Sequence, residues 1–242
     1  MLKRLFPEMD DRPDKGMFLA VILYGFMAFI LLPVVLVLLG ADMWNDRSTI
    51  VWLEVVYHLF NAFIAAAMFK SYLGDSFFNV QLFTKRFLKT VAIATLIMLS
   101  LALELQLGLG VPVLNAYPIN ELPIAMVSGL AVREQPIVGT LCYTLAAPFG
   151  VACLFYATGF APFCCKKPWL GYLIVPIVVA IPIALDVNWR GGAEWAIPTY
   201  LLQLPIHLLA CWSYQKADTI WAPITCLAIF NLATSLLCLL PI

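Results

Sequence analysis

The chain of 242 residues has few charged side chains. Only 12% of its residues are Asp, Glu, Lys or Arg, whereas an ordinary soluble domain has roughly 25%. With 63% hydrophobic residues, the sequence cannot cover a water-facing surface. Several segments of about 20 residues are long enough to cross a hydrocarbon core as helices. We therefore expect an all-α, polytopic membrane helical bundle that is surrounded by the lipid bilayer.

Other features that mark familiar protein classes are also scarce. The formal net charge is zero and no basic stripe with interleaved aromatics occurs, which argues against a nucleic-acid partner. The seven cysteines have neither the spacing of a zinc site nor that of a disulfide framework. We find no glycine-rich phosphate loop after a strand and no arrangement of serine, histidine and aspartate, so the chemistry of soluble hydrolases is not indicated.

Long apolar segments account for most of the sequence. Residues 1–16 are charged and read as a cytoplasmic N-terminal segment, and residues 17–242 read as a single transmembrane domain. The first apolar segment lacks a small-residue cleavage site, so we expect it to be retained as a span. The seven segments run roughly from 17 to 39, 50 to 69, 90 to 108, 138 to 160, 168 to 186, 196 to 213 and 220 to 240.

The basic residues between these segments indicate an orientation, because cytoplasmic loops carry the excess of lysine and arginine. With the N-terminus inside, only Arg47, Arg133 and Arg190 fall outside. This predicts about seven spans, an inner N-terminus and an outer C-terminus. The basic residues on the inner side are Lys3, Arg4, Arg12, Lys15, Lys70, Lys85, Arg86, Lys89, Lys166, Lys167 and Lys216.

Polar residues inside the apolar segments are the first candidates for a functional site, since they are costly in hydrocarbon. In the second segment, Glu54, His58 and Asn61 are spaced four and three residues apart, which puts them on one helical face. His58 and His207 differ by only about 5 Å in expected depth. We therefore interpret the polar residues of three segments as one candidate cluster, comprising Glu54, His58, Asn61, Gln203, His207 and Asn231.

This candidate cluster has three interpretations. It is a structural network of interhelical hydrogen bonds, a site for proton transfer or ligand binding, or a metal site with Glu54, His58 and His207 as ligands. The spacing of Glu54 and His58 differs from the H-E-x-x-H pattern of zinc metalloproteases. We expect no resident cofactor, and zinc or another divalent metal only if the chain is an active protease.

One stretch carries a more specific signal. Residues 214–231, YQKADTIWAPITCLAIFN, resemble the C-terminal motif of the CAAX prenyl protease and bacteriocin-processing family of intramembrane endopeptidases, also called the CPBP or Abi family. In that motif a turn of the form Y-x-K/R-T-G-S/T-I/L-W-A-P-I leads into a helix with a histidine and, four residues later, an asparagine or aspartate. Leu227 occupies the histidine position. The matching residues are Tyr214, Lys216, Thr219, Ile220, Trp221, Ala222, Pro223, Ile224 and Asn231.

Residues 147–163 resemble the first motif of the same family, P-x-x-E-E-x-x-F-R-G. Pro148, Leu154 and Phe155 match. The two glutamates are replaced by Val151 and Ala152, the arginine by Tyr156 and the glycine by Ala157. A second motif, phenylalanine followed four residues later by histidine, belongs in the segment 168–186. Neither residue is present there, and the nearest polar residue is Asp186.

The resemblance covers residues 138–242 and implies the fold of a CPBP-like core, in the plasma membrane of a bacterium. In the family, glutamates and histidines are thought to activate a water for peptide cleavage, directly or through a metal. Valine, alanine and leucine can neither take a proton nor polarise a carbonyl. The resemblance therefore implies an inactive pseudoprotease that binds a membrane-embedded protein or peptide. There are two alternatives. The first is an active endopeptidase, and so a hydrolase, that uses Glu54, His58 and His207 in place of the missing residues, and the second is a pathway for an ion or small molecule.

Overall fold

The structure is a computed structural model that describes residues 15–26, 47–110, 132–164, 167–189 and 193–239. Within these ranges every regular element is a helix and none is a strand, which confirms the all-α fold. Most of the N-terminal segment, residues 27–39 of the first apolar segment, and residues 111–131 of the longest loop lie outside the described residues.

For most of the helices, the first and last residues lie within a few positions of the ends of the predicted apolar segments. The fourth segment is one continuous helical stretch with two π-helical sections, η4 and η5. The elements are α1 (Lys15–Phe26), α4 (Arg47–Met68), α5 (Lys70–Leu82), α6 (Thr84–Gly110), α8 (Pro136–Leu141), η4 (Cys142–Ala146), α9 (Ala147–Val151), η5 (Ala152–Phe160), α10 (Ala161–Cys164), α11 (Pro168–Trp189), α12 (Ala193–Ala217) and α13 (Trp221–Leu239).

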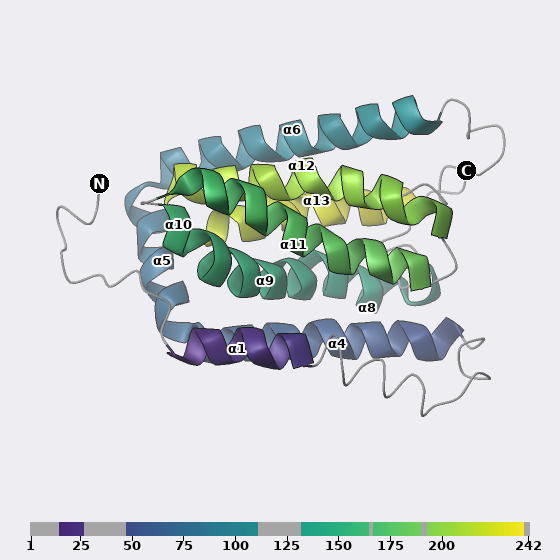
Figure 1. Cartoon of the computed structure of the whole chain (residues 1–242), viewed down its shortest axis with the longest axis horizontal. Coiled ribbons are helices and arrows are strands. Elements are labelled where there is room, and N and C mark those ends of the chain that lie inside the picture. The colour runs from purple at the N-terminus through teal and green to yellow at the C-terminus, as the bar shows by residue number, and fades with distance from the viewer. Residues whose placement is uncertain (1–14, 27–46, 111–131, 165–166, 190–192, 240–242) are drawn as a thin grey trace.

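The long helices run along a common direction, and α5 alone lies across one end of the bundle (Figure 1). Helix α6 lies along one side, α1 and α4 lie along the opposite side, and α11, α12 and α13 lie between them. The most extensive packing joins α11 to α12, and both α12 and α13 pack against α6. The continuous stretch from α8 to α10 connects the two sides, because it packs against α1 and α4 as well as α13.

Helix α5 differs from the sequence expectation, which treated residues 70–89 as a polar inner segment between two spans. Residues 70–82 contain no proline and a single glycine, Gly74, so nothing in the backbone interrupts a helix there. Leu73 and Ser76, three residues apart, share the buried face. The segment is a helix because this face packs on the bundle, although it is not long or apolar enough to span.

Three helical stretches are long and apolar enough to cross a membrane among the described residues: Val51–Met68, Thr84–Glu104 and Pro136–Cys164. Shorter apolar helices cover Pro168–Ala184 and Trp221–Leu236. These features indicate a membrane protein. Proline residues inside α11 and α12 agree with that environment, since neighbouring helices in a bundle can satisfy the backbone groups that proline releases.

The main core is a large set of buried apolar side chains from every long helix, in which Phe69, Met98 and Phe160 are fully buried. A smaller core of α4, η4 and α9 residues includes Val51 and Tyr143. Gly171 of α11 packs closely against the main core. A Cβ atom at Gly171 would lie 2.7 Å from Cδ2 of Phe160, so the absence of a side chain permits this approach. At Gly74 of α5, in contrast, a Cβ atom would have no neighbour within 4 Å.

We predict opposite effects for the same substitution at these two glycines. Gly171→Ala should lower the free energy of unfolding by about 1 to 3 kcal/mol, because the added methyl overpacks a buried ring. Gly74→Ala should raise it by about 0.5 to 1 kcal/mol, since glycine is unfavourable inside a helix. Unfolding titrations in mixed detergent micelles measure both. A destabilising effect of equal size at the two positions would contradict the packing described for α11.

Candidate functional site

The polar residues of the predicted cluster fall into two separate sets. The first, the Tyr143 set, comprises Glu54 and His58 of α4, Tyr143 of η4 and Asn231 of α13. The Tyr143 hydroxyl donates to Oε2 of Glu54 at 3.0 Å, and the rings of His58 and Tyr143 lie edge to face with centroids 5.1 Å apart. The set therefore joins three helices that are distant in sequence.

Asn231 takes part through its side-chain amide, which donates to the backbone carbonyl of Tyr143 at 2.8 Å. The local helix geometry explains why this carbonyl needs a donor. In the π-helical section the Ala147 N–H bonds to the carbonyl of Cys142, and the next residue, Pro148, has no N–H to give. A buried carbonyl without a partner is costly, so Asn231 supplies the hydrogen bond that the helix itself does not.

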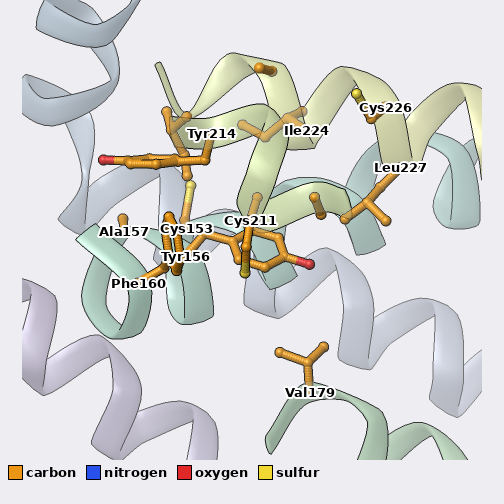
Figure 2. Close-up of a cluster of buried hydrophobic side chains, with 14 of the residues drawn as sticks. Cys153, Tyr156, Ala157, Phe160, Val179, Cys211, Tyr214, Ile224, Cys226 and Leu227 are labelled. Atoms are coloured by element: carbon orange, nitrogen blue, oxygen red, sulfur yellow. The ribbon is translucent and has the colours of Figure 1, made fainter. Parts of the chain in front are cut away.

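The second set, the Tyr156 set, lies in the apolar core. The hydroxyl of Tyr156, in η5, is 2.5 Å from Nδ1 of His207 in α12, and both side chains are buried. The other ring nitrogen of His207, Nε2, is buried and has no hydrogen-bond partner. Figure 2 shows the hydroxyls of Tyr156 and Tyr214 pointing to opposite sides of the surrounding apolar side chains.

The two sets are held apart by the helix that carries both tyrosines. Tyr143 and Tyr156 are separated by 13 positions in one continuous helical stretch, which corresponds to at most about 20 Å along the axis. The structure thus does not bring Glu54, His58 and His207 together as one group. No three His, Cys, Asp or Glu side chains in the described part of the chain are placed to hold a metal ion.

The remaining members of the predicted cluster, Asn61 and Gln203, are both buried. Asn61 lies where α4 passes α9, and a Cβ atom at Gly150 would be 3.4 Å from the Asn61 Cβ. The side-chain oxygen of Asn61 has no hydrogen-bond partner. Gln203 lies one helical turn before His207 in α12. Neither residue joins the Tyr143 and Tyr156 sets into one site.

The positions that resemble the catalytic motif are all in or against the main apolar core. Ala152, Tyr156 and Leu227 all belong to the same buried apolar core, and Val151 packs against it. Figure 2 shows Tyr156 and Leu227 among the buried side chains of this core, with Cys211 beside the Tyr156 ring. Val151, Ala152 and Leu227 have no side-chain group that can take a proton or polarise a carbonyl, and Tyr156 presents a hydroxyl that is bonded to His207.

The turn between α12 and α13 shows what the best-matching motif residues do. The hydroxyls of Tyr214 and Tyr72 hydrogen-bond to each other, and the Trp221 indole N–H donates to the Leu73 carbonyl at 3.1 Å. The Thr219 hydroxyl donates to the Ser76 carbonyl at 2.9 Å. All three partners belong to α5. The residues that carry the resemblance in this turn therefore dock it onto the helix across the end of the bundle.

Asp218 in the same turn has a positive φ of 58°, at the position where the motif has glycine. Glycine adopts this left-handed conformation without steric cost, and aspartate is one of the few other residues that tolerate it. Its carbonyl accepts a hydrogen bond from the Asn79 amide of α5 at 3.0 Å. The turn therefore places aspartate in a conformation that glycine would adopt without steric cost.

Sequence reasoning missed the partners of the candidate residues. Tyr143 and Ser76 were not named, and Tyr156 was named only as the residue at the arginine position of the motif, because single tyrosines and serines in apolar segments are common and have no distinctive spacing. Pro148, five residues after Tyr143, was a usable signal, since a proline leaves an upstream carbonyl without its donor. Asp186 lies within α11, but its side chain is outside the described residues.

We predict that Asn231 and Pro148 are energetically coupled. Asn231→Leu should lower the free energy of unfolding by about 1 to 3 kcal/mol, because it leaves the Tyr143 carbonyl unsatisfied. In a Pro148→Ala background the same substitution should cost less, since the backbone N–H that alanine restores at position 148 can bond that carbonyl. A double-mutant cycle in detergent micelles measures the difference. Equal costs in both backgrounds would show that Asn231 acts in another way.

Comparisons of the chain with known protein families, with characterised proteins and with solved structures found no match. The function of the site is therefore argued from the residues of this chain and their geometry.

Proposed function

We propose that the chain is a multi-pass membrane protein with a CPBP-like core, and that it is a pseudoenzyme that binds a membrane-embedded protein or peptide without cleaving it. The arrangement that we propose has seven spans and the N-terminus inside. It is supported by the common direction of α1, α4, α6, the stretch from α8 to α10, α11, α12 and α13 (Figure 1).

The observation that carries the proposal is the chemistry at the motif positions. Ala152 and Leu227 come from helices far apart in sequence and share one buried core, as expected if these positions once formed a site. Their side chains offer neither a base nor a polarising group. Tyr156 stands where the motif has arginine, and its hydroxyl is bonded to His207. This arrangement favours a retained scaffold over a working hydrolase.

An active endopeptidase built on Glu54, His58 and His207 has less support. Such an enzyme needs a base, a polarising group and the substrate carbonyl within hydrogen-bond reach of one another. Glu54 and His58 contact Tyr143, whereas His207 contacts Tyr156. A pathway for an ion or small molecule needs polar residues along its whole length, and the two separate sets do not favour one.

Binding in the plane of the membrane is supported by the surface of α4. Large apolar side chains of this helix are exposed, among them Trp52, Phe60 and Phe63. On the same helix Glu54 and His58 are only partly buried. A membrane-embedded segment that packs on the apolar side chains could add hydrogen bonds to these polar groups, and such bonds are a recurrent means of association between helices in lipid.

We predict that the purified chain in proteoliposomes binds a farnesylated peptide saturably and does not hydrolyse it or its unprenylated form. The His58→Ala, His207→Ala double variant should give the same background rate, because these residues do not form a catalytic group. Mass spectrometry of the peptide measures cleavage, and fluorescence anisotropy measures binding.

An active CPBP endopeptidase in the same liposomes is the positive control for cleavage. Hydrolysis that the double variant abolishes, or that a metal chelator abolishes, would overturn the pseudoenzyme proposal. If neither peptide binds saturably, the proposal that the chain binds a membrane-embedded peptide is overturned.

A further inference from the structure

Helix α5 has a position that the proposed peptide binding does not explain. It follows Met68 at the end of α4 and precedes Thr84 at the start of α6, and it lies across the direction of the other helices (Figure 1). If α4 and α6 cross a bilayer, α5 then lies parallel to the membrane surface at the level of the headgroups. Helices in this position are typically amphipathic and bind the interface.

The exposed side of α5 is partly aromatic. Phe77, Phe78 and Leu82 expose 47%, 50% and 49% of their surface, a poor arrangement for a helix surrounded by water. The Phe77 ring stacks edge to face on Trp221 with centroids 5.8 Å apart, so the apolar surface continues onto the start of α13. Aromatic side chains are enriched at this depth of a membrane protein, where their rings fit among the headgroups.

Positive charge gathers at the same end of the bundle. The six basic side chains described at this end are all exposed, and the acidic ones there are Asp75 and Asp218. At the opposite end the exposed charged side chains that the structure describes are Glu104, Arg133 and Glu134. The six basic residues are Lys70, Lys85, Arg86, Lys89, Lys167 and Lys216. A surplus of cations beside a membrane span complements anionic lipid headgroups.

We propose that α5 is an interfacial anchor, which inserts Phe77, Phe78 and Leu82 among the headgroups of one leaflet while Lys85, Arg86 and Lys89 bind anionic lipid. Three observations carry this inference: the transverse direction of the helix, its exposed aromatic residues, and the charge difference between the two ends of the bundle. The inference rests on the proposed membrane-spanning arrangement but not on the presence or absence of proteolysis. The group that the basic side chains bind is the phosphate of a lipid headgroup in the surrounding bilayer.

The position of α5 can be tested with a photo-crosslinking side chain in nanodiscs. We replace Phe77 or Phe78 with p-benzoylphenylalanine, and use Leu96 of α6, which is 65% exposed, as the control for a lipid-facing span. Intact-mass measurement after irradiation should show lipid adducts at all three positions, and unirradiated samples should show none. This side chain needs no cysteine labelling, which suits a chain with seven cysteines.

The outcomes separate the anchor from the spanning arrangement. Adducts at Leu96 but not at Phe77 or Phe78 would overturn the anchor and leave the spans intact. No lipid adduct at Leu96 would overturn both. Crosslinks from Phe77 or Phe78 to a second copy of the chain or to another protein, in place of lipid, would overturn the lipid assignment.

The charge contribution is tested by the lipid that copurifies from nanodiscs with equal amounts of phosphatidylglycerol and phosphatidylcholine. We expect the natural chain to enrich phosphatidylglycerol, and Arg86→Gln to lower this enrichment by up to about fivefold, the effect of one cation near a headgroup surface. Arg133→Gln, an equally conservative change at the opposite end, should leave the enrichment unchanged. Equal enrichment in all three proteins would overturn the role of the basic residues.

Discussion

The hydrogen bonds between α5 and the turn that joins α12 to α13 are the constraint on which the rest of the bundle depends. The Ser76 and Thr219 hydroxyls are 2.8 Å apart, and the Ile220 N–H donates to Oγ of Ser76 at 2.9 Å. Burial raises the pKa of the nearby Tyr72 hydroxyl, which therefore stays protonated at neutral pH in its bond to Tyr214. Because these groups are neutral, the contact should be insensitive to pH.

This contact has consequences along the whole length of the bundle. Helix α5 connects α4 on one side with α6 on the other, so its attachment to the turn ties both sides to α12 and α13. Those two helices carry His207 and Asn231, whose partners are on the stretch from η4 to η5. The turn therefore sets the registers in which Tyr156 meets His207 and Tyr143 meets Asn231. The residues of this turn that resemble a protease motif thus hold helices together by hydrogen bonds to α5.

Three pairs of polar groups inside the bundle satisfy each other, although Nε2 of His207 and Oδ1 of Asn61 have no hydrogen-bond partner. Asn231 supplies the donor that Pro148 removes, Tyr143 donates to Glu54, and Tyr156 pairs with His207. Satisfied buried polar groups stabilise a membrane bundle modestly and specify how its helices pack. A hydrolytic site needs a base and a polarising group beside one substrate, whereas these bonds place Glu54 and His207 in two separate sets. This is the physical basis for our proposal of a pseudoenzyme.

Parts of this structure could be predicted from the sequence and others could not. Continuous apolar runs predicted the long helices and the all-α fold. The free-energy cost of burying an amide in hydrocarbon indicated that Asn231 needs a hydrogen-bond partner. Helix α5 was missed because its charged and polar residues resemble a loop, whereas its packing on α4, α6 and α13 stabilises it as a helix. Depth along two helices suggested that His58 and His207 meet, but depth carries no information on lateral distance. Their tyrosine partners become evident only when the helices are assembled.

A double-mutant cycle between Ser76→Ala and Thr219→Val tests the central contact most directly, with unfolding free energies measured in mixed detergent micelles. The cycle that pairs Ser76→Ala with Thr95→Val, another buried threonine but in α6, is the matched control. The account predicts a coupling energy of about 0.5 to 3 kcal/mol for the first pair and additive effects, within about 0.5 kcal/mol, for the second. Additive effects in both cycles would contradict the claim that α5 holds the turn between α12 and α13.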